Sequence, residues 1–133
     1  MFFKGRDQFC EIVKELFSRL AVYDEVRKST EKLEVAFKFH IEDLRLEFTL
    51  IINKGNILLD FHNECQPKAV LKMSTDIFHH AMSGTLNLPA ALINKNLTID
   101  GDTRSILNLA ALGKSLSTTY STVYYEKVPA GNS

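Results

Sequence analysis

The chain has 133 residues, and its 16 basic and 16 acidic side chains give a formal net charge of zero. This length lies in the single-domain range and suffices to bury one sizeable core. Balanced charge excludes a long-range attraction to polyanions, so we expect no nucleic-acid partner and at most transient membrane contact. Cys10 and Cys65 show no metal-ligand spacing, and no apolar segment is long enough for secretion or membrane spanning, which predicts a cytoplasmic protein with reduced thiols.

The first predicted element is an amphipathic helix over residues 7–23. Its apolar residues recur at steps of three and four, with charged residues between them. They are Phe9, Ile12, Val13, Leu16, Phe17 and Leu20. This spacing predicts one buried stripe along the helix.

Three stretches of strict alternation follow, over residues 33–41, 44–52 and 57–62. Glu42-Asp43 separates the first two, and residues 53–56, which tolerate positive φ, separate the second from the third. Alternation of apolar and polar side chains is typical of strands with one buried face. The pattern therefore predicts a three-stranded antiparallel meander.

A fourth strand is predicted over residues 69–73, and residues 74–76 are of the types that cap helices at their N-terminus. The helix that they start should end at Gly84 in a left-handed cap. Asn87 and Pro89 indicate the start of a second short helix over residues 90–93. Residues 97–99 then alternate as a fifth strand.

Gly101-Asp102 predicts a turn and an N-cap for a last helix, from residue 103 to about residue 117. Gly113 and the serines and threonines that follow it weaken the helical pattern. We therefore expect residues 113–125 to be mobile or irregular, and to act as a gate if a ligand enters. The elements together predict an α+β fold, with one mainly antiparallel sheet and helices on one face.

Residues for catalysis are not recognisable in the sequence. It has no Gly-x-Ser-x-Gly elbow, and its glycines are too scattered to form a phosphate-binding loop. His79 and His80 point about 100° apart on a helix, so we interpret them as structural or surface residues rather than metal ligands. We expect no cofactor, no metal and no enzymatic activity.

The segment of residues 73–116 resembles the sterol carrier protein 2 family, also called the SCP2-like lipid-transfer domain. The family has a short helix after a strand, a Gly-x-Leu step, a second helix, and a strand that ends in an Ile-acid-Gly-Asp turn. Here the step is Gly84-Thr85-Leu86 and the turn is Ile99-Asp100-Gly101-Asp102. The order of the upstream elements also matches, although Lys95 stands where the family often has glycine before the fifth strand.

The resemblance implies a single lipid-binding domain over residues 1–133, with a five-stranded sheet covered by helices on one face and a hydrophobic tunnel between the layers. It implies a non-catalytic intracellular carrier of a sterol, a fatty acid or acyl chain, or a similar apolar ligand. The implied ligand-binding residues come from the sheet, the middle helices and the last helix. They are Phe37, Phe48, Leu50 and Leu71; Phe78, Met82, Leu86, Leu88, Leu92 and Ile93; and Ile106, Leu109, Ala110 and Leu116.

Two alternatives remain open at this point. The first is a scaffold or accessory module that binds a partner protein, for example in isoprenoid or quinone metabolism, and a filled core or a homodimer would favour it. The second is a small hydrolase or isomerase whose pocket recruits Asp60, His62 or Asp100 by tertiary contact. The sequence does not decide the ligand or the oligomeric state.

Overall fold

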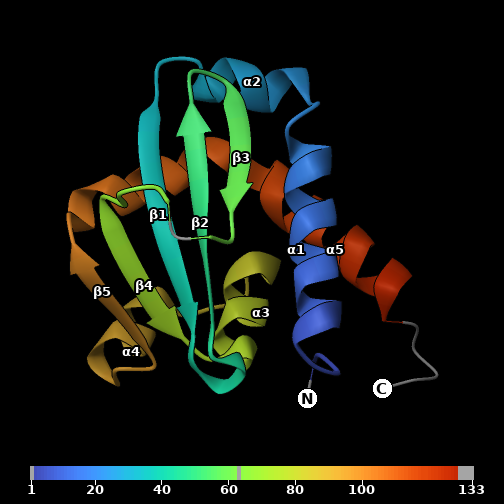
Figure 1. Ribbon diagram of the computed structural model, residues 1–133, viewed down its shortest axis with the longest axis vertical. Helices are drawn as coiled ribbons and strands as arrows, with labels where there is room; N and C mark the ends of the chain where they lie inside the picture. Colours follow the sequence, from blue (N-terminus) through green and yellow to red (C-terminus); the bar gives the residue numbers. More distant parts are fainter. Residues whose placement is uncertain (1, 63, 129–133) are drawn as a thin grey trace.

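The computed structural model describes residues 2–62 and 64–128, drawn in Figure 1. Two helices, α1 (Arg6–Leu20) and α2 (Asp24–Thr30), precede the first strand. The central elements are β1 (Glu34–Ile41), the 3-10 turn η1 (Glu42–Leu44), β2 (Leu46–Asn53), β3 (Asn56–Asp60) and β4 (Ala69–Met73). The remaining elements are α3 (Thr75–Ser83), α4 (Leu88–Ile93), β5 (Leu97–Gly101), the 3-10 helix η2 (Thr103–Leu112) and α5 (Gly113–Lys127).

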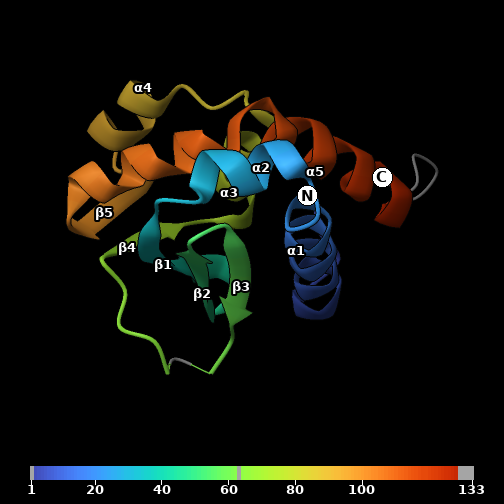
Figure 2. The ribbon, with the colours of Figure 1, turned by 90° about the horizontal axis from the view of Figure 1, so that it is seen from above.

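The five strands form one sheet in the order β3-β2-β1-β4-β5. All neighbouring strands are antiparallel except β1 and β4, which run parallel with Phe37 opposite Ala69. Figure 2 shows α2, α3, α4 and α5 on one side of the sheet and the connection from β3 to β4 on the other side. Helix α1 stands beside β3 and packs against α5. The predicted α+β class, with a mainly antiparallel sheet, is confirmed.

The alternation of apolar residues in the sequence becomes the buried face of the sheet. Residues of one parity in β1 and β2 turn toward the helices and are buried because they cover one another and the helical stripes. They are Phe37, Phe39 and Ile41 from β1, and Leu46, Phe48, Leu50 and Ile52 from β2. The stripe predicted on α1 is buried throughout and closes the core beside β3.

The first helix and the third strand are shorter than predicted from the sequence, and one helix was not predicted. Helix α1 ends at Leu20, and a separate helix α2 follows that the sequence analysis missed. Only two residues of α2, Val26 and Thr30, are buried, so it offers no apolar periodicity. The third strand ends at Asp60 rather than at residue 62.

The prediction for the C-terminal segment was wrong. Residues 103–112 form a 3-10 helix, and α5 continues as a regular helix to Lys127 instead of becoming irregular. Tyr120, Val123 and Tyr124 of α5 are buried at helical spacing, on the face that packs against α1 and α3. Tertiary packing thus outweighs the low helix propensity of the serines and threonines. A segment packed in this way gives no support to a mobile gate.

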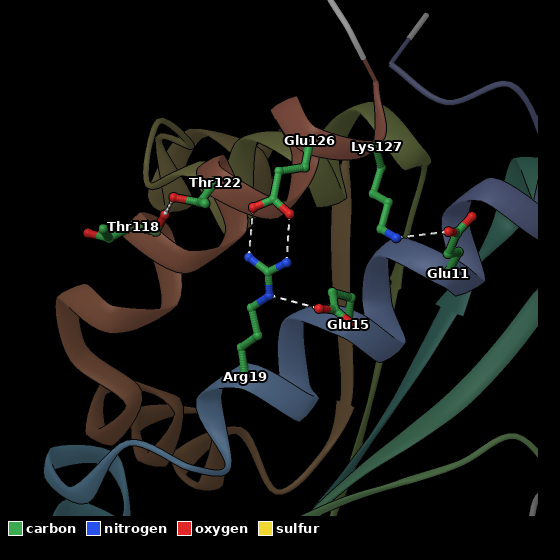
Figure 3. Close-up of polar contacts among 7 residues, drawn as sticks. All are labelled: Glu11, Glu15, Arg19, Thr118, Thr122, Glu126 and Lys127. Carbon is green, nitrogen blue, oxygen red and sulfur yellow. Dashed lines mark hydrogen bonds and ion pairs between the residues drawn. The ribbon is translucent and has the colours of Figure 1, made fainter.

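Charged side chains join the first helix to the last one, as Figure 3 shows. The guanidinium of Arg19 donates two hydrogen bonds to the carboxylate of Glu126, at 2.9 and 2.6 Å, and a third to Glu15 at 2.8 Å. The ammonium of Lys127 donates to Glu11 at 2.9 Å. These contacts are mostly exposed, so they align α1 and α5 more than they stabilise them.

Candidate ligand-binding site

The space between the sheet and helix α3 is filled by aromatic rings. Phe78 of α3 lies at the centre, with its ring centroid 4.9 Å from that of Phe9 and 6.3 Å from that of Tyr120. On the sheet, Phe39 and Phe48 are stacked with their centroids 5.0 Å apart. Close packing of this kind is typical of an ordinary protein core.

An open groove lies at the other end of the helix layer, between α4, β5 and η2. Its volume is about 660 Å³, within the usual range for small-molecule sites. Six apolar side chains line it, together with one lysine and two threonines. The apolar residues are Leu88, Leu92, Leu97, Ile99, Ile106 and Leu107, and the polar ones are Lys95, Thr98 and Thr103.

Large hydrophobic side chains remain exposed around this groove. Leu88 and Leu92 of α4 are 43% and 40% exposed, and Leu107 of η2 is 75% exposed. Ile93, at the end of α4, is 80% exposed. These four are half of the eight large exposed hydrophobic residues in the described part of the chain. Such clustering on two neighbouring elements is typical of a surface that binds an apolar partner.

Local turns fix the three elements that form the groove. The side chain of Asn87 accepts a hydrogen bond from the backbone of Ala90 at 3.1 Å and so caps α4, as predicted. At the far end of β5, Gly101 has φ of 105°, and a Cβ there would lie 2.6 Å from the backbone oxygen of Lys68. The same oxygen accepts a hydrogen bond from the backbone of Asp102 at 2.9 Å. Only glycine permits this close approach, which sets where η2 begins.

Lys95 forms the turn from α4 into β5 in an unfavourable backbone conformation. Its φ is 60°, in the left-handed region that glycine enters freely and other residues enter at a cost. The backbone N–H of Lys95 donates to the carbonyl of Leu92 at 3.3 Å, which closes the turn. This turn places the lysine on the rim of the groove as its only charged lining residue.

The predicted ligand residues divide into four groups in the structure. Three of them, Leu88, Leu92 and Ile106, line the groove. Six are buried in the core and do not line it: Phe37, Phe48, Leu50, Leu71, Phe78 and Met82. Three are half-buried against that core, namely Leu86, Leu109 and Leu116.

Two of the predicted ligand residues remain. The side chain of Ile93 points to solvent, and that of Ala110 lies outside the described part of the structure. The sequence analysis did not predict the other six lining residues, which are Lys95, Leu97, Thr98, Ile99, Thr103 and Leu107. The alternation in β5 could have indicated Leu97 and Ile99, but no pattern marked Leu107.

The residues considered for catalysis do not converge. The carboxylate of Asp60 accepts hydrogen bonds from the backbones of His62, Glu64 and Cys65 at 2.8 to 3.0 Å, and these bonds lower its pKa. Asp60 and Asp100 lie on the two opposite edge strands of the sheet. Four strand spacings put them on the order of 19 Å apart. The loop after β3 accounts for the carboxylate of Asp60, and the two carboxylates lie too far apart to share a reaction centre.

The histidine pair also has structural partners. The Nδ1 atom of His79 lies 2.8 Å from the hydroxyl of Tyr120, and the ring of Phe2 stacks on His79 with centroids 3.8 Å apart. Burial lowers the pKa of His79. His80 instead faces Thr85, with Nδ1 and Oγ1 2.9 Å apart. Within the described residues, no three side chains gather that could hold a metal ion, and no helix is long and apolar enough to span a membrane.

The sheet covered by helices on one side, with an apolar groove at one end of the helix layer, defines a small α+β domain with a surface suited to an apolar ligand. The family model for the SCP-2 sterol transfer family matches residues 13–114, and the chain belongs to this family. Membership implies binding or transfer of apolar lipids. The match ends at the start of α5, so the helix that packs against α1 lies almost wholly outside it.

Solved structures share the fold at low sequence identity. The UbiJ-SCP2 ubiquinone synthesis protein is 10% identical to this chain, with a TM-score of 0.62. The superposition covers 86% of this chain and 93% of the UbiJ-SCP2 chain. Sterol carrier protein 2 like 2 from Aedes aegypti is 16% identical with a TM-score of 0.60, covering 79% and 95%.

Part of a larger enzyme also has this fold. The sec-alkyl sulfatase PisA1 from Pseudomonas sp., as a double mutant, is 19% identical with a TM-score of 0.60 over 75% of this chain. This chain spans only 15% of the sulfatase. Among curated protein sequences, none is significantly similar to this chain. At these identities the structural likeness concerns the fold alone.

Proposed function

We propose that this protein is a non-catalytic carrier of an apolar lipid, a fatty acid or acyl chain, a sterol or a similar molecule. The ligand would bind in the groove between α4, β5 and η2. The observation that carries this proposal is the groove itself, about 660 Å³ in volume and lined by six apolar side chains. Family membership supports it, because the family is one of sterol transfer.

Burial of an alkyl chain supplies the driving force for binding. Each methylene group removed from water gains about 0.8 kcal/mol, so ten methylenes gain about 8 kcal/mol before the costs of binding. The ligand would also cover the leucines that now face solvent. Leucine side chains accept chains of varied shape, so we expect loose selectivity for the apolar part of the ligand.

Other features fit a carrier that works in the cytoplasm. Cys10 and Cys65 are unpaired, as in a reducing compartment. Ile93 and Leu107 protrude beside the groove and would allow transient contact with a membrane during loading. The separation of Asp60 from Asp100 supports the absence of catalysis.

The first experiment is to purify the protein without detergent, extract it with organic solvent and identify bound lipid by mass spectrometry against a mock purification. A fluorescent fatty acid is then titrated into the wild type, into the double variant Leu88→Ser/Leu92→Ser, and into Leu58→Ser. Leu58 is a matched control because it is 55% exposed on β3, at the opposite edge of the sheet.

We expect a stoichiometric lipid or micromolar binding in the wild type and in Leu58→Ser. The double variant should bind at least tenfold more weakly, because it replaces two apolar walls of the groove with hydroxyls. Absence of lipid in the extract together with failure of the titration would contradict the carrier function. Equal binding by all three proteins would instead move the ligand site elsewhere, for example to the tunnel predicted between the layers.

A second candidate function is an accessory module that binds a partner protein. The aromatic filling between the sheet and α3 favours it, because a filled interior leaves no role for an enclosed lipid. The fold shared with the UbiJ-SCP2 ubiquinone synthesis protein points the same way. Homodimer formation, measured by sedimentation velocity, combined with a negative lipid titration would favour this candidate.

A further inference from the structure

The lining of the groove includes one positively charged side chain. Lys95 is the only charged residue among the nine that line the groove. Among the described residues, only Arg19, Lys54 and Lys127 of the 16 lysines and arginines form ion pairs, so Lys95 is distinguished by its place in the groove. No ion pair among the described residues includes Lys95.

The backbone at Lys95 makes this placement costly for the fold. Its φ of 60° is in the left-handed region, where glycine or asparagine would be better tolerated than lysine. The lysine gains no ion pair in return. The turn explains the backbone conformation but not the choice of lysine for it, and a strained residue that lines a groove is a reason to look for a function there.

The residues around Lys95 determine which ligand would use its charge. Apolar side chains of α4 and η2, among them Leu92 and Ile106, offer a surface for an alkyl chain. The threonines Thr98 and Thr103 stand among the lining residues and can donate hydrogen bonds. No carboxylate lines the groove to repel an anion. The set as a whole matches a molecule with an apolar chain and one negatively charged end.

We propose that Lys95 makes the groove selective for single-chain lipids with an anionic head group. The ammonium pairs with the oxygen atoms of the head group, and the alkyl chain lies against the leucines of α4 and η2. A sterol hydroxyl or another neutral head group cannot form this ion pair, so neutral lipids bind more weakly. This inference rests on the proposed function, since it concerns the ligand of the same groove.

The test measures the affinity of four compounds with the same dodecyl chain by isothermal titration calorimetry. Dodecanoate and dodecyl phosphate carry an anionic end, dodecanol a neutral end and dodecylamine a cationic end. We expect the wild type to bind both anions about five- to tenfold more tightly than dodecanol, because charged hydrogen bonds beside an apolar surface are stronger than neutral ones. Dodecylamine should bind most weakly. The preference should shrink at high salt.

Substitutions then locate the effect. Lys95→Asn removes the charge and keeps a residue that tolerates the left-handed conformation, so the protein should remain folded by circular dichroism. It should bind dodecanoate no better than dodecanol, so that the ratio of the two affinities falls to about one. Lys95→Arg should retain the preference. Lys54→Asn is the matched control, because Lys54 also has a positive φ, of 49°, but does not line the groove.

The possible failures can be told apart. Equal affinities of the wild type for dodecanoate and dodecanol, or a preference that survives in Lys95→Asn, would overturn the role of Lys95 and leave the carrier function standing. Binding of none of the four compounds, with no lipid in the solvent extract, would overturn the carrier function itself. A preference for only one of the two anions supports the inference and identifies the head group.

Discussion

The two ends of the helix layer differ in how completely their apolar side chains are covered. Over β1 and β2, the helices α1, α3 and α5 enclose a core of aromatic rings, in which Phe9, Phe78 and Tyr120 are fully buried. Beside β5, the short helix α4 and the 3-10 helix η2 leave leucines uncovered around a groove. The difference predicts that substitutions can change the stability of the protein and the proposed ligand binding separately. We call these two parts the packed end and the open end.

The largest expected effect comes from removing an aromatic ring at the packed end. Phe78→Ala should lower the free energy of unfolding by about 3–5 kcal/mol, because it leaves a cavity among the surrounding rings. Urea denaturation of the variant and the wild type measures this difference. Leu92→Ala at the open end is the control and should change stability by only about 0.5 kcal/mol. Similar losses in both variants would remove the distinction between the two ends.

The turn after β5 offers the next largest effect. Gly101→Ala places a Cβ against the backbone oxygen of Lys68 at a φ of 105°, which should cost about 2–4 kcal/mol. Thermal and urea unfolding measure the loss. Gly5→Ala is the control, because a Cβ at Gly5 meets nothing within 4 Å. A stable Gly101→Ala variant would show that the turn can shift and that η2 is not held where we describe it.

From the sequence, the buried residues of the packed end could be predicted, whereas most residues that line the groove at the open end could not. Alternation over a long strand leaves one choice of buried face, so the burial of Phe37, Phe48 and Leu50 could be predicted. The six residues of α4 span less than two turns, and the direction of Ile93 could not be inferred from so short a pattern. The residues that line the groove are determined by the directions in which the side chains of such short elements point.

The 3-10 geometry of η2 explains a second failure. In a helix with three residues per turn, residues at steps of three share a face, so Ile106, Leu109 and Leu112 fall together. The α-helical pattern had grouped Ile106 and Leu109 with Ala110 and Leu116, and had left out Leu107 and Leu112. The regular course of α5 also could not be predicted, because its buried tyrosines pack against helices distant in sequence.

A smaller effect, of opposite sign, is expected at the start of β5. Lys95→Gly should raise the free energy of unfolding by about 0.5–1 kcal/mol, since relief of the left-handed strain exceeds the entropic cost of glycine. Chemical denaturation measures the change. A gain in stability accompanied by loss of the preference for anionic lipids would identify Lys95 as a residue kept for binding at the expense of stability. Unchanged stability would mean that the strain at Lys95 is negligible.

The smallest effect is a pH dependence at the packed end. Burial holds the pKa of His79 below its ordinary value of 6.5 in the folded state. The unfolded chain therefore binds more protons than the folded protein just below pH 6.5, and the free energy of unfolding decreases as the pH falls from 6.5 toward 5. The pKa values of Asp60 and Glu126 are lowered from their ordinary values of 3.8 and 4.5. These two carboxylates therefore change the free energy of unfolding only in more acidic solution.

Unfolding in urea at pH 5, 6 and 7 tests this dependence. His79→Gln should flatten the slope between pH 5 and 7, because glutamine does not titrate. His62→Gln, at an exposed position in the connection from β3 to β4, should leave the slope as in the wild type. If the wild type loses no stability between pH 7 and pH 5, His79 is not desolvated as described.

The contact between the first and the last helix also bears on how the protein is made. The hydroxyl of Tyr124 in α5 donates to the backbone oxygen of Phe2, and α1 has its main helical neighbour in α5. About 100 residues separate these helices, so at ribosomal speeds α1 emerges on the order of ten seconds before its partner. During that interval β3 and α3 can cover part of the apolar stripe of α1, but the part that faces α5 stays exposed and is available to a chaperone. The nascent chain therefore keeps some apolar surface uncovered until synthesis reaches α5.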